Sequence, residues 1–231
     1  MNNAQVLQLL QNRIGSADWS KWGIYRWVWY DYVRYPGAGT TQLQFFVNPL
    51  GTVDPTSALA KTLEQTNGPK SRAFGQTFFV IQEIRTHVHI LPKLRQPAAL
   101  ATDADLLYTT IENMMEQFYD LIGAGVLSMQ IGQKDYFELE KPFKRCPPGL
   151  GVEIFQHGAL SDFCMWIQQS PHTEDIWGVT PAQMVEPEQT INLNIDFPQG
   201  NPATFTNLVN SATPSVDIGV LLDGYIARPA Q

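Results

Sequence analysis

Apolar and polar residues alternate along several stretches of the chain, and this period of two is typical of β-strands with one buried face. The most regular case is residues 190–197, where every second residue is apolar. Residues 216–228 alternate in the same way as far as Asp223-Gly224. Gly, Pro and Asn residues lie between the two stretches and are typical of loops. The pattern therefore predicts two strands near the C-terminus.

Two longer stretches predict strands in the first half of the chain. Residues 22–35 are rich in aromatic and β-branched residues, so bulky groups lie on both faces of this strand. Asp31 stands in its middle, either as a buried acid or as a group exposed at a strand edge. The strand predicted at 76–91 has one apolar and one polar face. Phe78, Val80, Ile84, Val88 and Ile90 form the apolar face, and Glu83, Arg85, His87 and His89 form the polar face.

Shorter strands are predicted between and around these stretches. They lie at residues 42–47, 126–131, 136–139, 151–155 and 162–168. The polar connection at residues 50–72 is long for a compact domain, which predicts a functional or interface loop.

Helical spacing occurs at two places. Residues 3–15 predict a short N-terminal helix with an apolar stripe of Val6, Leu9, Leu10 and Ile14. Residues 102–122 predict a longer helix, inserted among the strands, which begins with a capping-box pattern at Thr102 and Asp105.

This order of elements predicts a mainly β protein. Many short strands with Gly and Pro between them are typical of a sandwich or barrel, and eight strands in two sheets make a jelly roll. We therefore expect a jelly-roll sandwich, single or as a compressed double, with the inserted helix at about 102–122. Residues 1–22 form an N-terminal helical arm in this interpretation, and residues 23–231 form the jelly-roll domain.

Composition adds an argument about assembly. Only 16% of the 231 residues are charged, against about 25% in an ordinary soluble protein. Contacts between subunits bury surface where charge is depleted and aromatic residues are enriched, and the chain has six Trp, eight Tyr and twelve Phe. Trp27, Trp29 and Tyr32 are accordingly expected in the core or at a subunit interface, with a sugar-binding face as the alternative.

Charge and cysteine content restrict the partners. The net charge of −7 and the lack of a clustered basic segment argue against direct nucleic-acid binding. No apolar run is long enough to span a membrane, and the N-terminus lacks the pattern of a secretory signal. Cys146 and Cys164 fit no metal or disulfide motif and are expected as reduced thiols. We expect synthesis in the cytoplasm.

Candidate catalytic groups are few. His87 and His89 form the His-x-His pair that cupin enzymes use for metal, but the acid expected soon after it is missing. Glu112, Glu116 and Asp120 are spaced for one solvated helix face. His157, Ser161 and Asp162 provide the residue types of a triad without its sequence context. We expect no enzyme, no metal and no cofactor.

A family resemblance is carried by segments 44–47, 61–63, 66–68, 74–75, 78–84, 131–136 with Pro142, 147–151, and 220–229. These segments resemble the major capsid proteins of small tailless, often membrane-containing bacteriophages. The resemblance covers about half of the chain. It implies jelly-roll subunits that pack into an icosahedral shell, located in the virion.

The expected partners follow from that resemblance. They are copies of the same chain, other capsid proteins and an internal lipid membrane. A cupin-like metal-dependent enzyme and a carbohydrate-binding β-sandwich are the alternative functions.

The N-terminal helix has its own expected role. Arg13 is its one charged residue, so attraction to anionic lipid is weak. We expect its apolar stripe to bind a groove on a neighbouring subunit, with lipid contact as the alternative.

Overall fold

The computed structural model describes ten segments of the chain, and the account below concerns these residues. They are residues 3–15, 19–36, 39–55, 58–68, 75–90, 125–136, 153–156, 163–166, 177–197 and 216–230. The predicted helix at 102–122 and Cys146 lie outside them, as do His157, Ser161 and Asp162.

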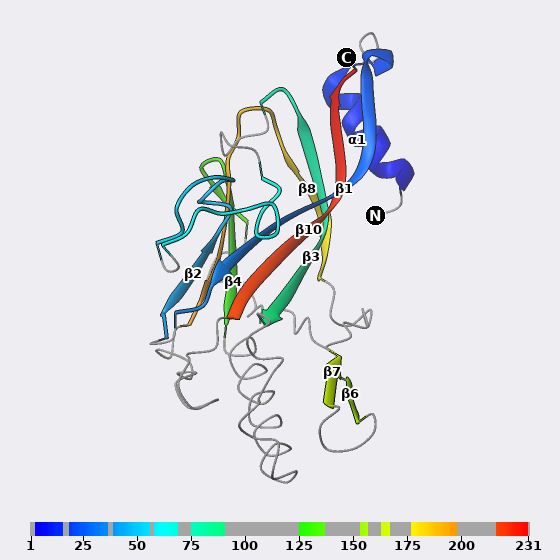
Figure 1. Ribbon diagram of the computed structural model, residues 1–231. Coiled ribbons are helices and arrows are strands. Elements are labelled where there is room, and N and C mark those ends of the chain that lie inside the picture. The colour runs from blue at the N-terminus through cyan, green and yellow to red at the C-terminus, as the bar shows by residue number, and fades with distance from the viewer. Residues whose placement is uncertain are drawn as a thin grey trace.

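The described residues form a mainly β fold of two antiparallel four-stranded sheets with one short N-terminal helix (Figure 1). The first sheet has the order β1 (Trp22–Arg34), β10 (Val216–Pro229), β3 (Phe78–Ile90) and β8 (Trp177–Val185). The second has the order β2 (Gln42–Phe45), β9 (Ile191–Asp196), β4 (Val126–Ile131) and β5 (Lys134–Asp135). A separate hairpin joins β6 (Glu153–Gln156) to β7 (Phe163–Trp166).

The strands of the two sheets pair in a nested pattern. When β6 and β7 are set aside, the first strand pairs with the last, β2 with β9, β3 with β8, and β4 with β5. All of these pairs are antiparallel. The chain thus runs out through four strands and returns beside itself through four others. Two further pairings, β10 with β3 and β9 with β4, join the nested pairs into sheets.

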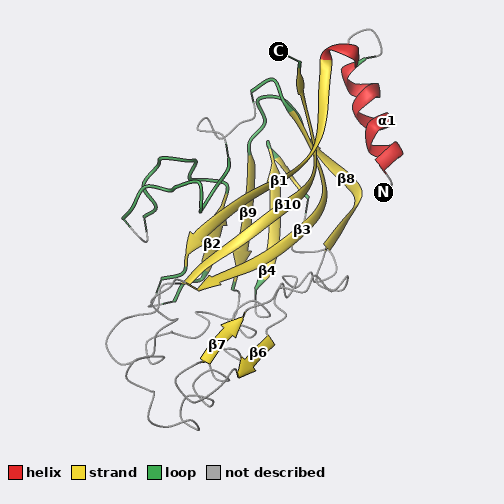
Figure 2. Ribbon diagram, turned by 45° about the vertical axis from the view of Figure 1, so that its right-hand side comes forward, coloured by secondary structure: helices red, strands yellow, loops and turns green. Residues whose placement is uncertain are grey.

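The main core lies between the two sheets, which face each other in Figure 2. It takes alternate residues of the strands, as the period-two pattern predicts. Ile191, Leu193 and Ile195 of β9 are buried there, together with Ile218, Val220 and Leu222 of β10. The predicted alternation of both C-terminal strands is confirmed.

A β-bulge at Gln82 changes which face of β3 is apolar. Glu83 pairs with Asp223 and Ile81 with Gly224, so Gln82 is the extra residue on β3. Beyond a bulge the alternation reverses relative to the strand that precedes it. Ile81 and Ile84 therefore both face the main core, whereas Val80 faces the opposite side of the sheet. The predicted single apolar face that joined Phe78 and Val80 to Ile84 is wrong for this reason.

Strand β8 was not predicted from the sequence. Pro181 lies within it, and proline is tolerated mainly in edge strands and at irregularities. Both conditions hold, because β8 is an edge strand and its register with β3 is broken between Ile81 and Glu83.

A second apolar cluster holds α1 (Asn3–Ile14) against the outer face of the first sheet. Val6 and Leu10 are fully buried there against Val80, Ala182 and Ala227 of β3, β8 and β10. An amphipathic helix of this length is marginal by itself and is stabilised by such packing. The 3₁₀ turn η1 (Trp19–Lys21) then leads into β1.

Gly224 is required by the close approach of β10 to β3. A Cβ at this position would lie 1.8 Å from the carbonyl oxygen of Val80, which is backbone and cannot rotate away. We predict that Gly224→Ala lowers the free energy of unfolding by about 3 kcal/mol, at the upper end of the usual cost of overpacking. Urea denaturation measures the change.

Gly178→Ala is the matched control, because a Cβ there would meet no atom within 4 Å. Its expected effect is below about 0.5 kcal/mol. Equal losses in the two variants would contradict the steric explanation for Gly224.

Candidate functional site

The interaction residues expected on β1 lie in three different environments. Trp29 is buried in the main core, where its ring centroid lies 4.7 Å from that of Phe46. Trp27, two residues earlier, is 43% exposed. Tyr32 lies on the outer face of the first sheet over Gly219 and hydrogen-bonds His87 Nδ1 through its hydroxyl at 2.9 Å. Of the three, Trp27 is the residue with a large accessible aromatic surface.

The apolar stripe of α1 is occupied within the chain. Val6 and Leu10 contact the first sheet directly, and Leu9 and Ile14 pack around them. The expected contact of this stripe with a neighbouring subunit stays a prediction, as does the division of the chain at residue 22. Leu7 lies outside the stripe and is partly exposed.

A buried ion pair fixes the long connection between β2 and β3. Lys61 Nζ lies 2.7 Å from Asp31 Oδ1, and both side chains are almost completely buried. The other carboxylate oxygen of Asp31 accepts a hydrogen bond of 2.7 Å from the backbone N–H of Phe46. Burial raises the pKa of Asp31, and the Lys61 ammonium opposes this rise. Of the two positions left open for Asp31, the structure shows the buried one.

Phe46 adopts an unusual backbone conformation beside this pair. Its φ of 63° lies in the left-handed region, which is unfavourable for a bulky L-residue. The hydrogen bond to Asp31 and the ring contact with Trp29 hold it there. Backbone strain of this kind persists where the surroundings determine the conformation. The chain therefore turns sharply out of β2 at a defined angle.

The same connection covers part of the edge of β1. The backbone of Thr66 forms an isolated bridge with Asp31, and the amide side chain of Asn67 bonds the backbone of Val28 and Tyr30. These bonds satisfy groups that an edge strand would otherwise present to another chain. Sequence reasoning predicted a functional or interface loop at 50–72 but did not identify Lys61 or Asn67 as the residues that fix it.

Residues 52–55 and 58–61 of this connection run antiparallel to each other, and we name them the loop hairpin. Residues 56 and 57 are outside the described part of the chain. Val53 and Ala60 form a bridge, and Asp54 N–H donates to Leu59 O. Lys61 at its base and Asp54 near its turn are buried, whereas Val53 and Leu59 are more than 60% exposed. Charge inside with aliphatic groups outside is the reverse of the usual arrangement of a surface loop.

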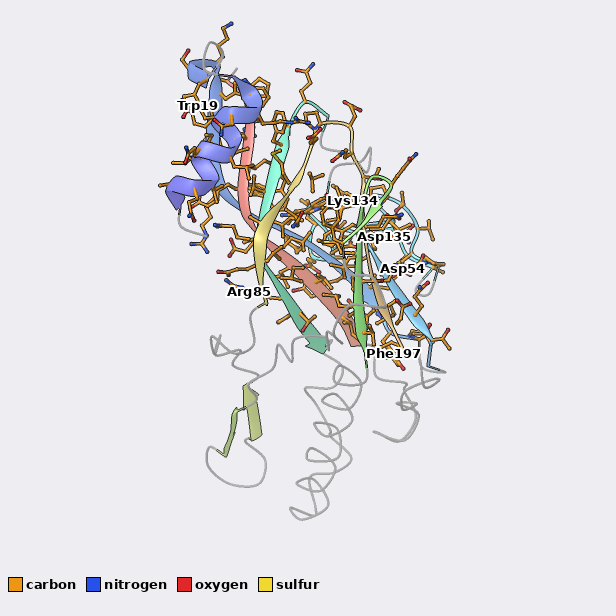
Figure 3. The ribbon with its side chains drawn as sticks, turned by 180° about the vertical axis from the view of Figure 1, so that it is seen from behind. Trp19, Asp54, Arg85, Lys134, Asp135 and Phe197 are labelled. Atoms are coloured by element: carbon orange, nitrogen blue, oxygen red, sulfur yellow. The ribbon has the colours of Figure 1, made fainter. Side chains whose placement is uncertain are left out.

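The rest of the outer face of the first sheet carries charged groups that are paired with one another. Asp223 accepts hydrogen bonds from Arg26 and Arg85, and Arg85 also binds Glu83. In Figure 3, Arg85 points away from the space between the sheets. Because these charges balance locally, this face offers no excess of cations for phosphate groups.

The cupin-like pair is not assembled into a metal site by the described residues. His87 faces outward, pairs with Gly219 on β10, and is hydrogen-bonded across that glycine to the hydroxyl of Tyr32 on β1. The side chain of His89 lies outside the described set. No group of three or more His, Cys, Asp or Glu with metal-binding geometry occurs among the described residues.

Comparison with known proteins returns no relative. No family model matches the chain, and neither a curated protein nor a solved structure matches it. Within the described part, no helix is long and apolar enough to cross a membrane.

The ion pair is expected to contribute strongly to stability. We predict that Lys61→Met lowers the free energy of unfolding by about 3–5 kcal/mol, because it leaves the Asp31 carboxylate buried without its partner. The exposed pair Arg13–Glu186 provides the control, and Arg13→Gln should cost less than about 1 kcal/mol. Denaturant titration at neutral pH measures both variants.

The pH dependence of the free energy of unfolding of Lys61→Met provides a second test of the ion pair. A carboxyl whose pKa is higher in the folded than in the unfolded state stabilises the fold at low pH, and this contribution is lost as the pH rises through the folded pKa. Lys61→Met should therefore lose stability as the pH rises above about 4, near the unfolded pKa of aspartate. Asp31→Asn/Lys61→Met should not show this slope. A similar slope in the double variant would contradict the assignment to Asp31.

Proposed function

We propose that the chain is a jelly-roll coat subunit that assembles with copies of itself into an icosahedral virus shell. The observation that carries the proposal is the nested pairing of strands, first with last and inward to β4 with β5. A long antiparallel ribbon rolled into two facing sheets would produce this order, which is also the order expected of a jelly roll with two Greek keys. The two four-stranded sheets formed by the described residues favour the single over the double form.

Surface chemistry supports a structural rather than a catalytic role. On the first sheet several charged side chains form local pairs, such as Arg34 with Asp217, while large apolar groups of the described residues are exposed. The whole chain has few charged residues and a net charge of −7. Such a subunit associates through apolar contacts and does not need nucleic acid to neutralise it.

Assembly of the purified protein tests this proposal. We predict that the full chain forms particles of uniform size in near-physiological salt, and that nuclease treatment leaves their size unchanged. Light scattering and electron microscopy measure the particles. A stable monomer at micromolar concentration in sedimentation experiments would contradict the proposed function.

A carbohydrate-binding module is the second candidate. Tyr25 and Trp27 are exposed two residues apart on β1, so their side chains lie on the same face of the strand. Neighbouring aromatic rings can bind sugars by stacking. Glycan binding that Trp27→Ala abolishes without any change in particle formation would favour this candidate.

A further inference from the structure

Strand β1 lies at the edge of the first sheet, and its two halves differ in what lies beside them (Figure 1). β10 pairs with one side of β1 along its whole length. On the other side, residues 65–67 bond to the second half of β1, between residues 28 and 32, through their backbone and through the side chain of Asn67. Among the described residues, nothing bonds in this way to the first half, residues 22–27.

The bonds to residues 65–67 show which backbone groups of β1 point away from β10. All of them are made by the even-numbered residues from 28 to 32. Alternate residues of a strand direct their N–H and C=O groups to the same side, and the register of β1 with β10 is continuous. The N–H and C=O groups of Trp22, Ile24 and Arg26 therefore point to the open edge. Within the part of the chain that the structure describes, these groups form no hydrogen bond.

This open edge lacks the features by which proteins usually prevent edge strands from pairing. Such features are Lys and Pro residues, bulges and very short strands. Residues 22–27 contain no Lys or Pro, and no register shift interrupts their pairing with β10. Arg26 carries the one charge of this half, and Asp223 on the neighbouring strand binds it. Tyr25 and Trp27 expose aromatic surface beside the edge. The edge is therefore suited to the addition of another strand.

The row of open backbone groups fits the same strand of a second copy. The open residues are centred on Ile24, so an antiparallel copy turned about a two-fold axis at Ile24 places Trp22 opposite Arg26. Each open N–H and C=O group then has a partner. A register shifted toward the end of the strand would involve Val28, whose carbonyl oxygen already accepts a hydrogen bond from Asn67. A register shifted the other way would involve residues that precede the strand.

The side chains are also complementary in this register. On one face, Tyr25 stands opposite Gly23 of the second copy, which has no side chain. The ring of Tyr25 lies over Gly23 of its own strand, so the two Tyr25 rings come side by side. On the other face, Ile24 stands opposite Ile24, and Arg26 stands opposite the ring of Trp22, which favours a cation–π contact. An isologous contact requires a surface that is complementary to itself, and the first half of β1 meets this requirement.

We infer that two copies of the chain pair through the first halves of their β1 strands, antiparallel about a two-fold axis at Ile24. The first sheets of the two copies then join into one continuous sheet. The pairing ends at Val28 of each copy, where residues 65–67 cover the edge. The inference rests on the proposed self-assembly and names one contact that carries it.

A proline on the open edge tests the pairing. The N–H of Arg26 points to that edge, so Arg26→Pro leaves the ladder with β10 intact and removes a donor that the second copy would use. We predict that Arg26→Pro sediments as a smaller species than the wild type. Arg26→Lys retains the N–H and the positive charge and should assemble normally. Circular dichroism and urea denaturation check folding. If Arg26→Pro does not fold, Ile24→Pro takes its place, with Ile24→Val as the control.

A cysteine at the axis tests the register. In a Cys146→Ser/Cys164→Ser background, Ile24→Cys places two thiols opposite each other in a hydrogen-bonded pair. Their Cα atoms are then about 5.5 Å apart, a separation that a disulfide can bridge. Mild oxidation should therefore give a covalent dimer. Tyr25→Cys in the same background stands opposite Gly23 and should give none.

The outcomes separate this contact from the proposed function. Normal particles of Arg26→Pro would overturn the pairing and leave the proposed function intact. Loss of assembly in Arg26→Pro without a covalent dimer of Ile24→Cys would also overturn it, because a different strand would then occupy the edge. A covalent dimer of Tyr25→Cys in place of Ile24→Cys would overturn the register. Wild-type dimers that never build particles, with Ile24→Cys cross-linked, would support the pairing and contradict the proposed shell.

Discussion

The pairing of the first strand with the last constrains the rest of the structure. β1 and β10 pair antiparallel along the whole of β1, from Trp22 with Pro229 to Arg34 with Asp217. Nearly two hundred residues separate these partners, so the pairing has a large entropic cost of loop closure. The buried faces of both strands offset it, because Trp29, Ile218, Val220 and Leu222 enter one core. In the observed fold the intervening strands β2, β3 and β4 pair with β9, β8 and β5 in nested order inside this pair.

The buried ion pair fixes the exposed connection between β2 and β3 to strand β1. Lys61 and Asp31 are both inside, and the cost of removing two charges from water is met only because they contact each other and Phe46. Apolar residues in place of the pair could give comparable stability. What the ion pair adds is position, because the buried Lys61 can meet only one acid on β1, Asp31. The exposed aliphatic groups of the hairpin are thereby held in a fixed place relative to the sandwich.

Strand β3 contributes apolar side chains to both faces of the first sheet, toward the second sheet and toward α1. On β3, the bulge at Gln82 lets Val80 contact α1 while Ile81 and Ile84 both contact the second sheet. Gly224 makes room for this irregularity on the neighbouring strand. Without the bulge, a regular strand would direct either Ile81 or Ile84 away from the main core.

Local pattern determined much of the fold. The alternation in β9 and β10, the long strands β1 and β3, and the helix at the N-terminus were predicted within a few residues of their observed bounds. These features depend on a side-chain period of two or 3.6, which neighbouring residues show by themselves. The charge deficit likewise follows from composition and indicated an associating surface.

Tertiary structure alone decided the partners of particular side chains. Nothing in the sequence marks Asp31 as the partner of Lys61, because Asp31 lies thirty positions earlier on β1 and Glu64 is much nearer in the chain. The same reason hid the bulge at Gln82 and the strand that contains Pro181, since both depend on which strand lies alongside. The sequence showed that Val6 and Leu10 form an apolar stripe but not that their own sheet would cover it. Periodicity defines a buried face, whereas the surface that buries it is set by contacts distant in the chain.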